Sequence, residues 1–200
     1  MPTFIVRAHS APTDPAAFLG RAGADAHVEY LAQIVTEGLF VSKGHRSDMV
    51  LVLVLERSTD FSRAITLRGD CLGSLDGLTE NDLLETLADA LHAGRDLAKE
   101  ASISLENGIT VAAISFERVV KQQTGAREIF LLDKKGEDVR DAMFGEDPVF
   151  LLTDHVPMPR NLHKSLIRQG AKPISIGPLM LRASQAIVIV QNEIDRRIAG

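Results

Sequence analysis

Three short segments near the carboxyl end of the chain combine apolar residues with residues that can form hydrogen bonds. Each follows a run that is typical of a β-strand: residues 131–136 (LLDKKG), 151–155 (LLTDH) and 175–181 (SIGPLML). Ligands of open α/β sheets bind beyond the carboxyl ends of the strands, so we expect these segments to meet around a ligand. Each residue taken alone is more typical of a core leucine or a turn glycine, and only the joint pattern favours a site.

Other common catalytic sites lack their signatures in this sequence. No glycine-spaced dinucleotide fingerprint follows a predicted strand, and no Gly-Lys-Ser/Thr ending marks a P-loop. The chain has six histidines, none in the i, i+4 helical pair of a zinc protease, and it has no Gly-x-Ser-x-Gly nucleophile elbow. We therefore expect no nucleotide hydrolysis, no serine hydrolysis and no metal.

Strand-like and helix-like patterns alternate along the chain and would position these segments. Short β-branched and apolar runs predict strands at 3–8, 49–55, 64–67, 109–113, 128–132, 149–152 and 173–176. Helical spacing and capping signals predict helices at 25–40, with Asp25 as N-cap, and at 79–100, 116–123, 160–169 and 184–198. This order predicts an α/β fold, a mostly parallel sheet flanked by helices, with 49–55 as a central strand.

The last predicted helix is the ambiguous element. Residues 186–190 are rich in β-branched side chains, which favour a strand. However, Ile187, Val190, Ile194 and Ile198 keep helical spacing into the charged tail, and we predict a helix on that ground.

The composition describes an ordinary globular chain. It has 200 residues, of which 45% are hydrophobic and 24% are charged, so a single domain is expected. The net charge of −5 argues against a protein coated in basic residues and leaves room for a local basic patch only. The lone cysteine, Cys71, favours a reducing compartment, and we expect a cytoplasmic protein without a signal peptide or membrane span.

Two further motifs complete a recognisable set. They are residues 6–13 (VRAHSAPT) and 40–48 (FVSKGHRSD), to which the Ile-Gly-Pro-x-x-Leu of 176–181 and the Asn-Glu-x-Asp of 192–195 can be added. With the three segments above, in this order and spacing, the chain resembles the tRNA pseudouridine N1-methyltransferases of the knotted SPOUT superfamily over essentially its full length. The resemblance implies methylation of N1 of pseudouridine in the T-loop of tRNA (position 54).

The resemblance also implies an architecture. A Rossmann-like part (about 1–125) would precede a C-terminal part (about 126–200) tied in a trefoil knot, whose loops hold S-adenosyl-L-methionine in a bent form. The cofactor-binding residues carried over by position are Leu132, Thr153, Asp154, His155, Ile176, Gly177, Pro178, Leu179, Leu181 and Ala186. An adenine ring needs such an apolar slot with backbone groups at its edge, and Gly177 would permit close backbone approach. Relatives often carry cysteine where this chain has Ala186, so contact there would be through the backbone.

Catalysis is expected to rest on Asp48 and Arg46. Asp48 would orient or deprotonate the base, although an unperturbed Asp pKa of about 3.9 makes it a poor base unless burial raises that pKa. Arg46 would hold a phosphate or the base edge, and Arg7, His9 and Lys43 would extend the substrate patch. The alternatives are a surface ion pair for Arg46 and Asp48 and a loop-capping role for His9.

Three questions stay open at this point. The chain could be an RNA-binding knotted module without catalysis, or a methyltransferase acting on a different RNA or a small molecule. The family implies a homodimer, in which the stripe Ile187, Val190 and Ile194 would face a second copy. The same stripe could equally pack inside one chain.

Overall fold

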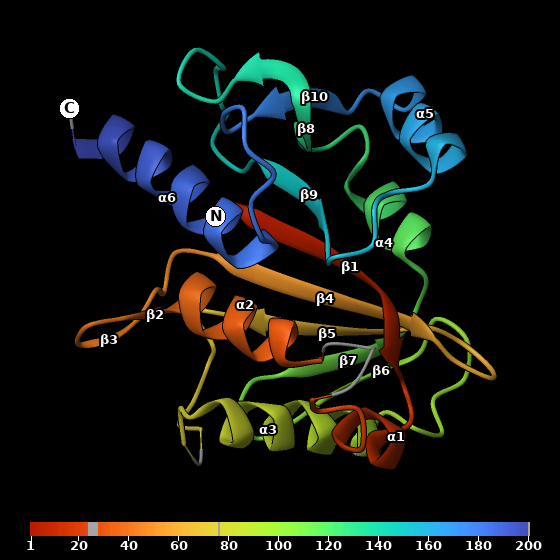
Figure 1. The fold of residues 1–200 in the computed structure, drawn as a ribbon. Coiled ribbons are helices and arrows are strands. Elements are labelled where there is room, and N and C mark those ends of the chain that lie inside the picture. Colours follow the sequence, from red (N-terminus) through yellow and green to blue (C-terminus); the bar gives the residue numbers. More distant parts are fainter. Residues whose placement is uncertain (24–27, 76, 200) are drawn as a thin grey trace.

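The computed structural model describes residues 1–23, 28–75 and 77–199. Within these ranges, eight strands form one sheet in the order β10-β8-β9-β1-β4-β5-β7-β6 (Figure 1). Their bounds are β1 (Thr3–Pro12), β4 (Val50–Arg57), β5 (Arg63–Arg68), β6 (Ser102–Ser104), β7 (Thr110–Ala113), β8 (Ile129–Asp138), β9 (Val149–Thr153) and β10 (Lys172–Ser175). A separate hairpin consists of β2 (Phe40–Val41) and β3 (Gly44–His45).

The sheet has a parallel half and an antiparallel half. Strands β10, β8, β9, β1 and β4 pair in parallel, whereas β5, β7 and β6 pair antiparallel beyond β4. The central strands β1 and β4 are apolar along most of their length because helices cover both of their faces. The predicted mostly parallel α/β sheet is confirmed, and 49–55 does form a central strand.

Helices cover both faces of the sheet. One face carries α1 (Pro15–Leu19), α2 (Glu29–Leu39), α3 (Glu80–Ala93) and α6 (Ala183–Ala199), which share a hydrophobic cluster with the sheet. The other face carries α4 (Phe116–Gln123) and α5 (Arg160–Arg168), which pack in a second cluster. The ambiguous last segment is therefore a helix, as its spacing predicted.

Several predicted boundaries were wrong for identifiable reasons. Strand β1 continues to Pro12, beyond the predicted end at residue 8, because its pairing with β4 resumes after an irregularity. Helix α3 begins behind its N-cap Thr79 with a capping box, as expected, but ends at Ala93 with Gly94 as C-cap. Helix α2 begins at Glu29 with Val28 as N-cap, and the proposed N-cap Asp25 lies outside the described residues. The sequence analysis missed α1, β6 and the β2–β3 hairpin.

The stripe on α6 packs inside this chain. Ile187 and Val190 are fully buried in the cluster that α6 shares with α2, and Ile194 packs against that cluster. Gln191 of the same helix donates to Gly38 O at 2.7 Å. The expectation that these three residues face a second copy is therefore corrected, because α2 already covers them.

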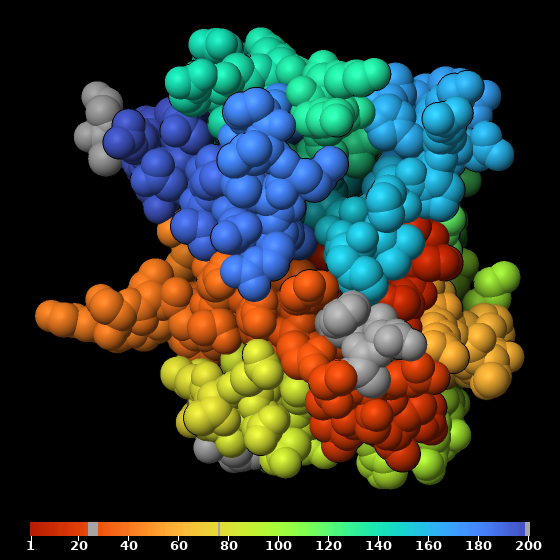
Figure 2. All heavy atoms as spheres, viewed as in Figure 1, coloured from red at the N-terminus to blue at the C-terminus, as the bar shows by residue number. Residues whose placement is uncertain are grey.

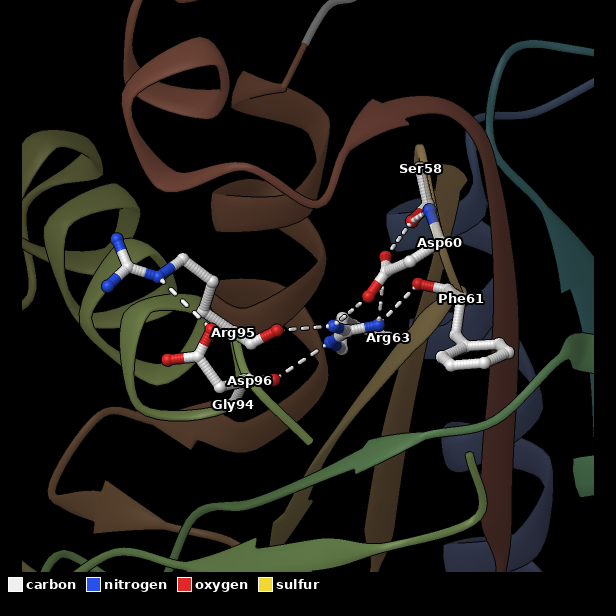
Figure 3. A network of polar contacts seen from close by, with 7 residues as sticks. All are labelled: Ser58, Asp60, Phe61, Arg63, Gly94, Arg95 and Asp96. Carbon is white, nitrogen blue, oxygen red and sulfur yellow. Dashed lines mark hydrogen bonds and ion pairs between the residues drawn. The ribbon is translucent and has the colours of Figure 1, made fainter. Parts of the chain in front are cut away.

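A buried arginine closes the end of α3 at the antiparallel half. Arg63 is 2% exposed and donates from Nε to Gly94 O at 2.9 Å and from Nη2 to Arg95 O at 2.7 Å (Figure 3). Its Nη1 donates to Phe61 O, and its Nη2 forms an ion pair with Asp60 at 2.8 Å. The guanidinium thus satisfies carbonyls that the helix end leaves open.

Candidate functional site

The first predicted segment leaves the sheet as a wide bulge in β8. In the pairing of β8 with β10, Pro173 lies opposite Leu131, but the next residue, Ile174, lies opposite Glu137. Residues 132–136 are therefore looped out at the point where β8 also stops pairing with β9. A Cβ on Gly136 would lie 2.4 Å from Ile174 N, so glycine lets β10 pass close to the bulge.

The second segment turns away at the carboxyl end of β9. Thr153 pairs with Arg7 of β1, and Asp154 N then donates to Arg7 O at 3.0 Å. The Asp154 carboxylate accepts a hydrogen bond from Val156 N at 2.8 Å, which folds the chain into a turn. His155 is exposed beyond it, with its ring 5.6 Å from that of Tyr30.

The third segment joins β10 to α6 and depends on glycine. Gly177 has φ +124°, a backbone conformation that L side chains rarely adopt, and a Cβ there would meet nothing within 4 Å. Glycine is needed here for its backbone angle in this structure, rather than for space. Beyond it, Leu179 and Met180 are 73% and 84% exposed, and Leu181 turns back toward the protein.

These three segments line one cavity of about 490 Å³. In Figure 2 the surface is hollowed between residues 177–183 and the segment after β9. The cavity contains nine of the predicted cofactor residues: Leu132, Thr153, Asp154, His155, Ile176, Gly177, Leu179, Leu181 and Ala186. Pro178, the tenth, is exposed and does not line it. The prediction that the segments meet is confirmed, whereas the binding role of each residue stays a prediction.

Two carboxylates in the cavity differ in their surroundings. Burial raises the pKa of Asp154 above its usual value, against weaker opposing hydrogen bonds from backbone amides. Asp133 has a lowered pKa, because Lys135 N donates to it, and it also forms a 2.8 Å contact with His163 Nε2. Asp154 is therefore the more easily protonated carboxylate of the two.

Sequence reasoning missed several lining residues. Tyr30 and Ile34 of α2, Asp133, His163 of α5 and Ser184 of α6 all border the cavity. Asp133 stands inside the first segment and could have been found there. Nothing in the local sequence marks the others, because only the packing of α2, α5 and α6 brings them to the strand ends.

The predicted catalytic pair lies at the opposite edge of the sheet. Arg46 forms ion pairs with Asp48 at 3.0 Å and with Asp195 of α6, and its hydrogen bond with Asp195 is the main cause of a raised Arg46 pKa. Asp48 precedes the first residue of β4. The cavity lies at the bulge of β8 and beyond the carboxyl end of β9, and both of these strands run parallel with β4. Along α6, Asp195 is nine residues from Ala186, about 14 Å. One chain does not bring Arg46 and Asp48 to its own cavity.

Two of the three predicted substrate residues lie together near the cavity end of β1, and the third lies in the β2–β3 hairpin. Arg7 is buried and forms an ion pair with Glu56 at 2.6 Å, and His9 Nδ1 lies 3.0 Å from the same carboxylate. One guanidinium nitrogen of Arg7, Nη1, has no hydrogen-bond partner among the described residues. Lys43 is exposed in the β2–β3 hairpin, which projects from the body of the protein (Figure 2).

The described residues contain neither a metal-binding cluster nor a membrane-spanning helix. No group of three or more His, Cys, Asp or Glu side chains there could hold a metal ion. No described helix is long and apolar enough to cross a membrane.

Comparisons with known proteins converge on one family. A family model described as "Putative SAM-dependent RNA methyltransferase" matches residues 1–199. A "Putative pseudouridine methyltransferase" of Vibrio parahaemolyticus serotype O3:K6 is 46% identical over 197 residues, which cover 98% of this chain and 99% of that protein. The protein of the same name from Shewanella frigidimarina is 43% identical over 198 residues, 99% of this chain and 100% of its own.

A solved structure agrees on the fold. The crystal structure of Archaeoglobus fulgidus Nep1 bound to S-adenosylhomocysteine superimposes with a TM-score of 0.60, covering 100% of this chain and 99% of that one. At 12% identity this likeness bears on the fold alone. It confirms the expected fold class, and the trefoil knot stays a prediction.

Proposed function

The chain belongs to the family of SAM-dependent RNA methyltransferases, and from this premise we propose that it methylates N1 of pseudouridine in the T-loop of tRNA, at position 54. The names of its relatives support pseudouridine as the substrate. The choice of tRNA and of position 54 rests on the resemblance of the sequence motifs to those of the tRNA enzymes.

The cavity at the strand ends is the observation that carries the proposal. Its volume of about 490 Å³ lies within the usual range for small-molecule sites. Apolar side chains from the three segments can cover an adenine ring, while polar lining residues such as Thr153 and Ser184 offer hydrogen bonds. The residues present therefore fit S-adenosyl-L-methionine, and when bound that cofactor would supply an activated methyl group.

The protein must align the acceptor nitrogen and receive its proton. N1 of pseudouridine loses a proton as it gains the methyl group, so a proton acceptor has to stand beside it. We propose Asp154 for this step, because its carboxylate lines the cavity and its raised pKa favours proton uptake. Its backbone contact with Arg7 places the predicted substrate residues Arg7 and His9 next to the same end of the sheet.

Asp48 and Arg46 are proposed to act from a second copy. Within one chain, the end of β9 lies level with Val54 of β4, about 20 Å of strand beyond Asp48. A homodimer that places one chain's Asp48 against the other's cavity would bring both to the substrate. Lys43, on the projecting hairpin of the same region, would then extend the RNA contact.

Transfer of labelled methyl groups tests the substrate. Purified protein and labelled S-adenosyl-L-methionine are incubated with three tRNAs: one with pseudouridine at position 54, one with uridine there, and one with pseudouridine only at another position. We expect label in the first tRNA alone. Label in the third tRNA would show that the protein methylates pseudouridine at another position. Cofactor binding without any transfer would favour an RNA-binding module without catalysis.

Mixed dimers test the shared site. An Asp48→Asn chain is combined with an Asp154→Asn chain, each inactive or weak on its own. If sites are shared, the mixture regains part of the activity, because one of the two cavities then combines intact residues from both chains. A mixture as weak as its components would contradict the role of Asp48 across the interface. Light scattering at micromolar concentration checks that the protein is a dimer.

The knot and the location complete the proposal. The close passage of β10 beside the β8 bulge supports a knotted C-terminal part (about 126–200) behind a Rossmann-like part (about 1–125). A cytoplasmic location fits an RNA substrate and an unpaired, exposed Cys71.

A further inference from the structure

Ser184 is buried with an unused hydroxyl. The residue is 2% exposed, and its Oγ finds no hydrogen-bond partner among the described residues. Leaving a buried polar group without a partner destabilises the folded protein. Thr3 Oγ1 is another such hydroxyl among the described residues, so the place of Ser184 in the fold has to decide whether it serves a ligand.

Ser184 borders the cavity at the first turn of α6. Ser184 lines the cavity together with Ala183 and Ala186 of the same turn. The N-cap residue Arg182 has its backbone N–H bound to Gln185 Oε1 at 3.1 Å, and the first intrahelical bond runs from Ala186 N to Arg182 O at 2.9 Å. The amides between them lack intrahelical acceptors, as at any helix start. Ser184 and these amides therefore form a group of hydrogen-bond donors at a helix start that borders a ligand-sized cavity.

The surroundings decide which part of a ligand can reach these donors. Ala186 is 5% exposed, and Ile174 beside the cavity is fully buried. An ionised carboxylate or ammonium in such an apolar place would carry a large desolvation cost. A neutral aromatic ring with acceptor nitrogens on its edge pays much less and gains hydrogen bonds from the donors.

We propose that Ser184 Oγ donates a hydrogen bond to a ring nitrogen of the adenine of S-adenosyl-L-methionine. This inference rests on the proposed function, since it assigns a residue to the same cavity. The hydroxyl would have a partner only when the cofactor is bound. Ser184 would therefore lower the stability of the free protein, raise its affinity for the cofactor and favour adenine over other bases.

Two matched variants test the inference without any transfer reaction. Ser184→Ala removes the hydroxyl in the cavity. Thr3→Val removes another buried hydroxyl without a partner, 4% exposed, at the start of β1 on the opposite edge of the sheet. Thermal unfolding gives the stability of each free protein, and calorimetry gives its affinity for S-adenosylhomocysteine.

We expect both variants to unfold at the same or a higher temperature than the wild type, because each removes an unsatisfied group. Only Ser184→Ala should bind S-adenosylhomocysteine more weakly, by about 3- to 10-fold, the range of one net hydrogen bond. Unchanged affinity in Ser184→Ala would overturn the inference. Failure of the wild type itself to bind S-adenosylhomocysteine at millimolar concentration would instead overturn the proposed function.

Deaza analogues of S-adenosylhomocysteine identify the acceptor. Replacing N1, N3 or N7 of adenine by carbon removes one acceptor at a time. For one analogue, the loss caused by Ser184→Ala should disappear, because the bond is already absent. An equal loss for all analogues would show that Ser184 acts on the shape of the cavity, and would contradict the direct contact.

Discussion

Two buried polar regions of this chain differ in whether their hydrogen bonds are complete. Around Arg63, at the end of α3, every nitrogen of the guanidinium donates to a carbonyl or a carboxylate (Figure 3). In the cavity at the carboxyl ends of the parallel strands, Ser184 Oγ finds no partner among the described residues. Arg63 and Ser184 are equally buried, so their difference lies in hydrogen bonding, and we propose that Arg63 holds the fold whereas Ser184 serves a ligand.

The comparison predicts a division between stability and function. Changes at Arg63 should lower the free energy of unfolding and leave ligand binding intact. Changes in the cavity should lower binding or transfer and leave the fold as stable, or more stable. The variants below test that division, and the change expected to matter most comes first.

Arg63→Met should be the most destabilising change. It leaves the carbonyls of Gly94, Arg95 and Phe61 without their donor, and a buried acceptor left unsatisfied costs about 1–3 kcal/mol. Denaturant unfolding measures the loss. Affinity for S-adenosylhomocysteine at 25 °C should stay within twofold of the wild type, and a tenfold loss would break the comparison.

The pH dependence of unfolding tests how much the ion pair between Arg63 and Asp60 contributes to stability. Hydrogen bonds from Arg63 lower the pKa of Asp60 in the folded protein. A lowered folded pKa contributes stability above the unfolded pKa, near 3.9, and that stability is lost as pH falls further. Wild-type stability should therefore fall more steeply below about pH 4 than that of Arg63→Met. Parallel curves would show that the ion pair contributes nothing.

Asp154→Asn should produce the largest loss of function. Without a proton acceptor beside N1, kcat should fall by about 100-fold or more, while affinity for S-adenosylhomocysteine changes by less than threefold. Burial disfavours the ionised carboxylate, so the neutral amide should raise the unfolding temperature at pH 8. A variant that loses cofactor affinity and keeps kcat would make Asp154 a cofactor ligand instead.

Gly177→Ala should have an intermediate effect. A methyl group meets no atom there, so the cost is backbone strain at φ +124°, about 1–3 kcal/mol. The third segment would relieve that strain by moving away from the cavity. We expect about tenfold weaker S-adenosylhomocysteine binding and little change in unfolding by denaturant. Full affinity in this variant would show that the segment need not hold its present shape.

Asp195→Asn should have the smallest effect. The carboxylate pairs with Arg46 near the carboxyl end of α6, and both partners reach solvent. Exposed ion pairs contribute about 0–1 kcal/mol. Unfolding in low and in high salt should differ little from the wild type, and a loss above 2 kcal/mol would place Arg46 among the groups that hold the fold.

The sequence was informative where local pattern and strand order decide the structure. The continuous apolar run at 49–55 predicted a buried central strand, and the Thr79 capping signal located the start of α3. The three segments at 131–136, 151–155 and 175–181 were placed together because parallel strands end at one edge, and they do line one cavity.

The remaining features depend on contacts between distant parts of the chain. Ser184 Oγ lacks a hydrogen-bond partner among the described residues only because of how α6 packs on the rest of the chain, and no local sequence pattern indicates that. Arg63 caps a helix end 31 residues away. Arg46 and Asp48 read as one functional patch with Arg7 in sequence, yet the direction of β4 sends them to the other edge of the sheet.

Calorimetric titration of the wild-type protein with S-adenosylhomocysteine tests the central claim most directly, with the pocket-filling variant Ala186→Phe as control. The account predicts one molecule bound per chain in the wild type and no measurable binding in a folded Ala186→Phe protein. Absence of binding to the wild type at millimolar concentration, or equal binding by the two proteins, would contradict the assignment of the cavity as the methyl-donor site.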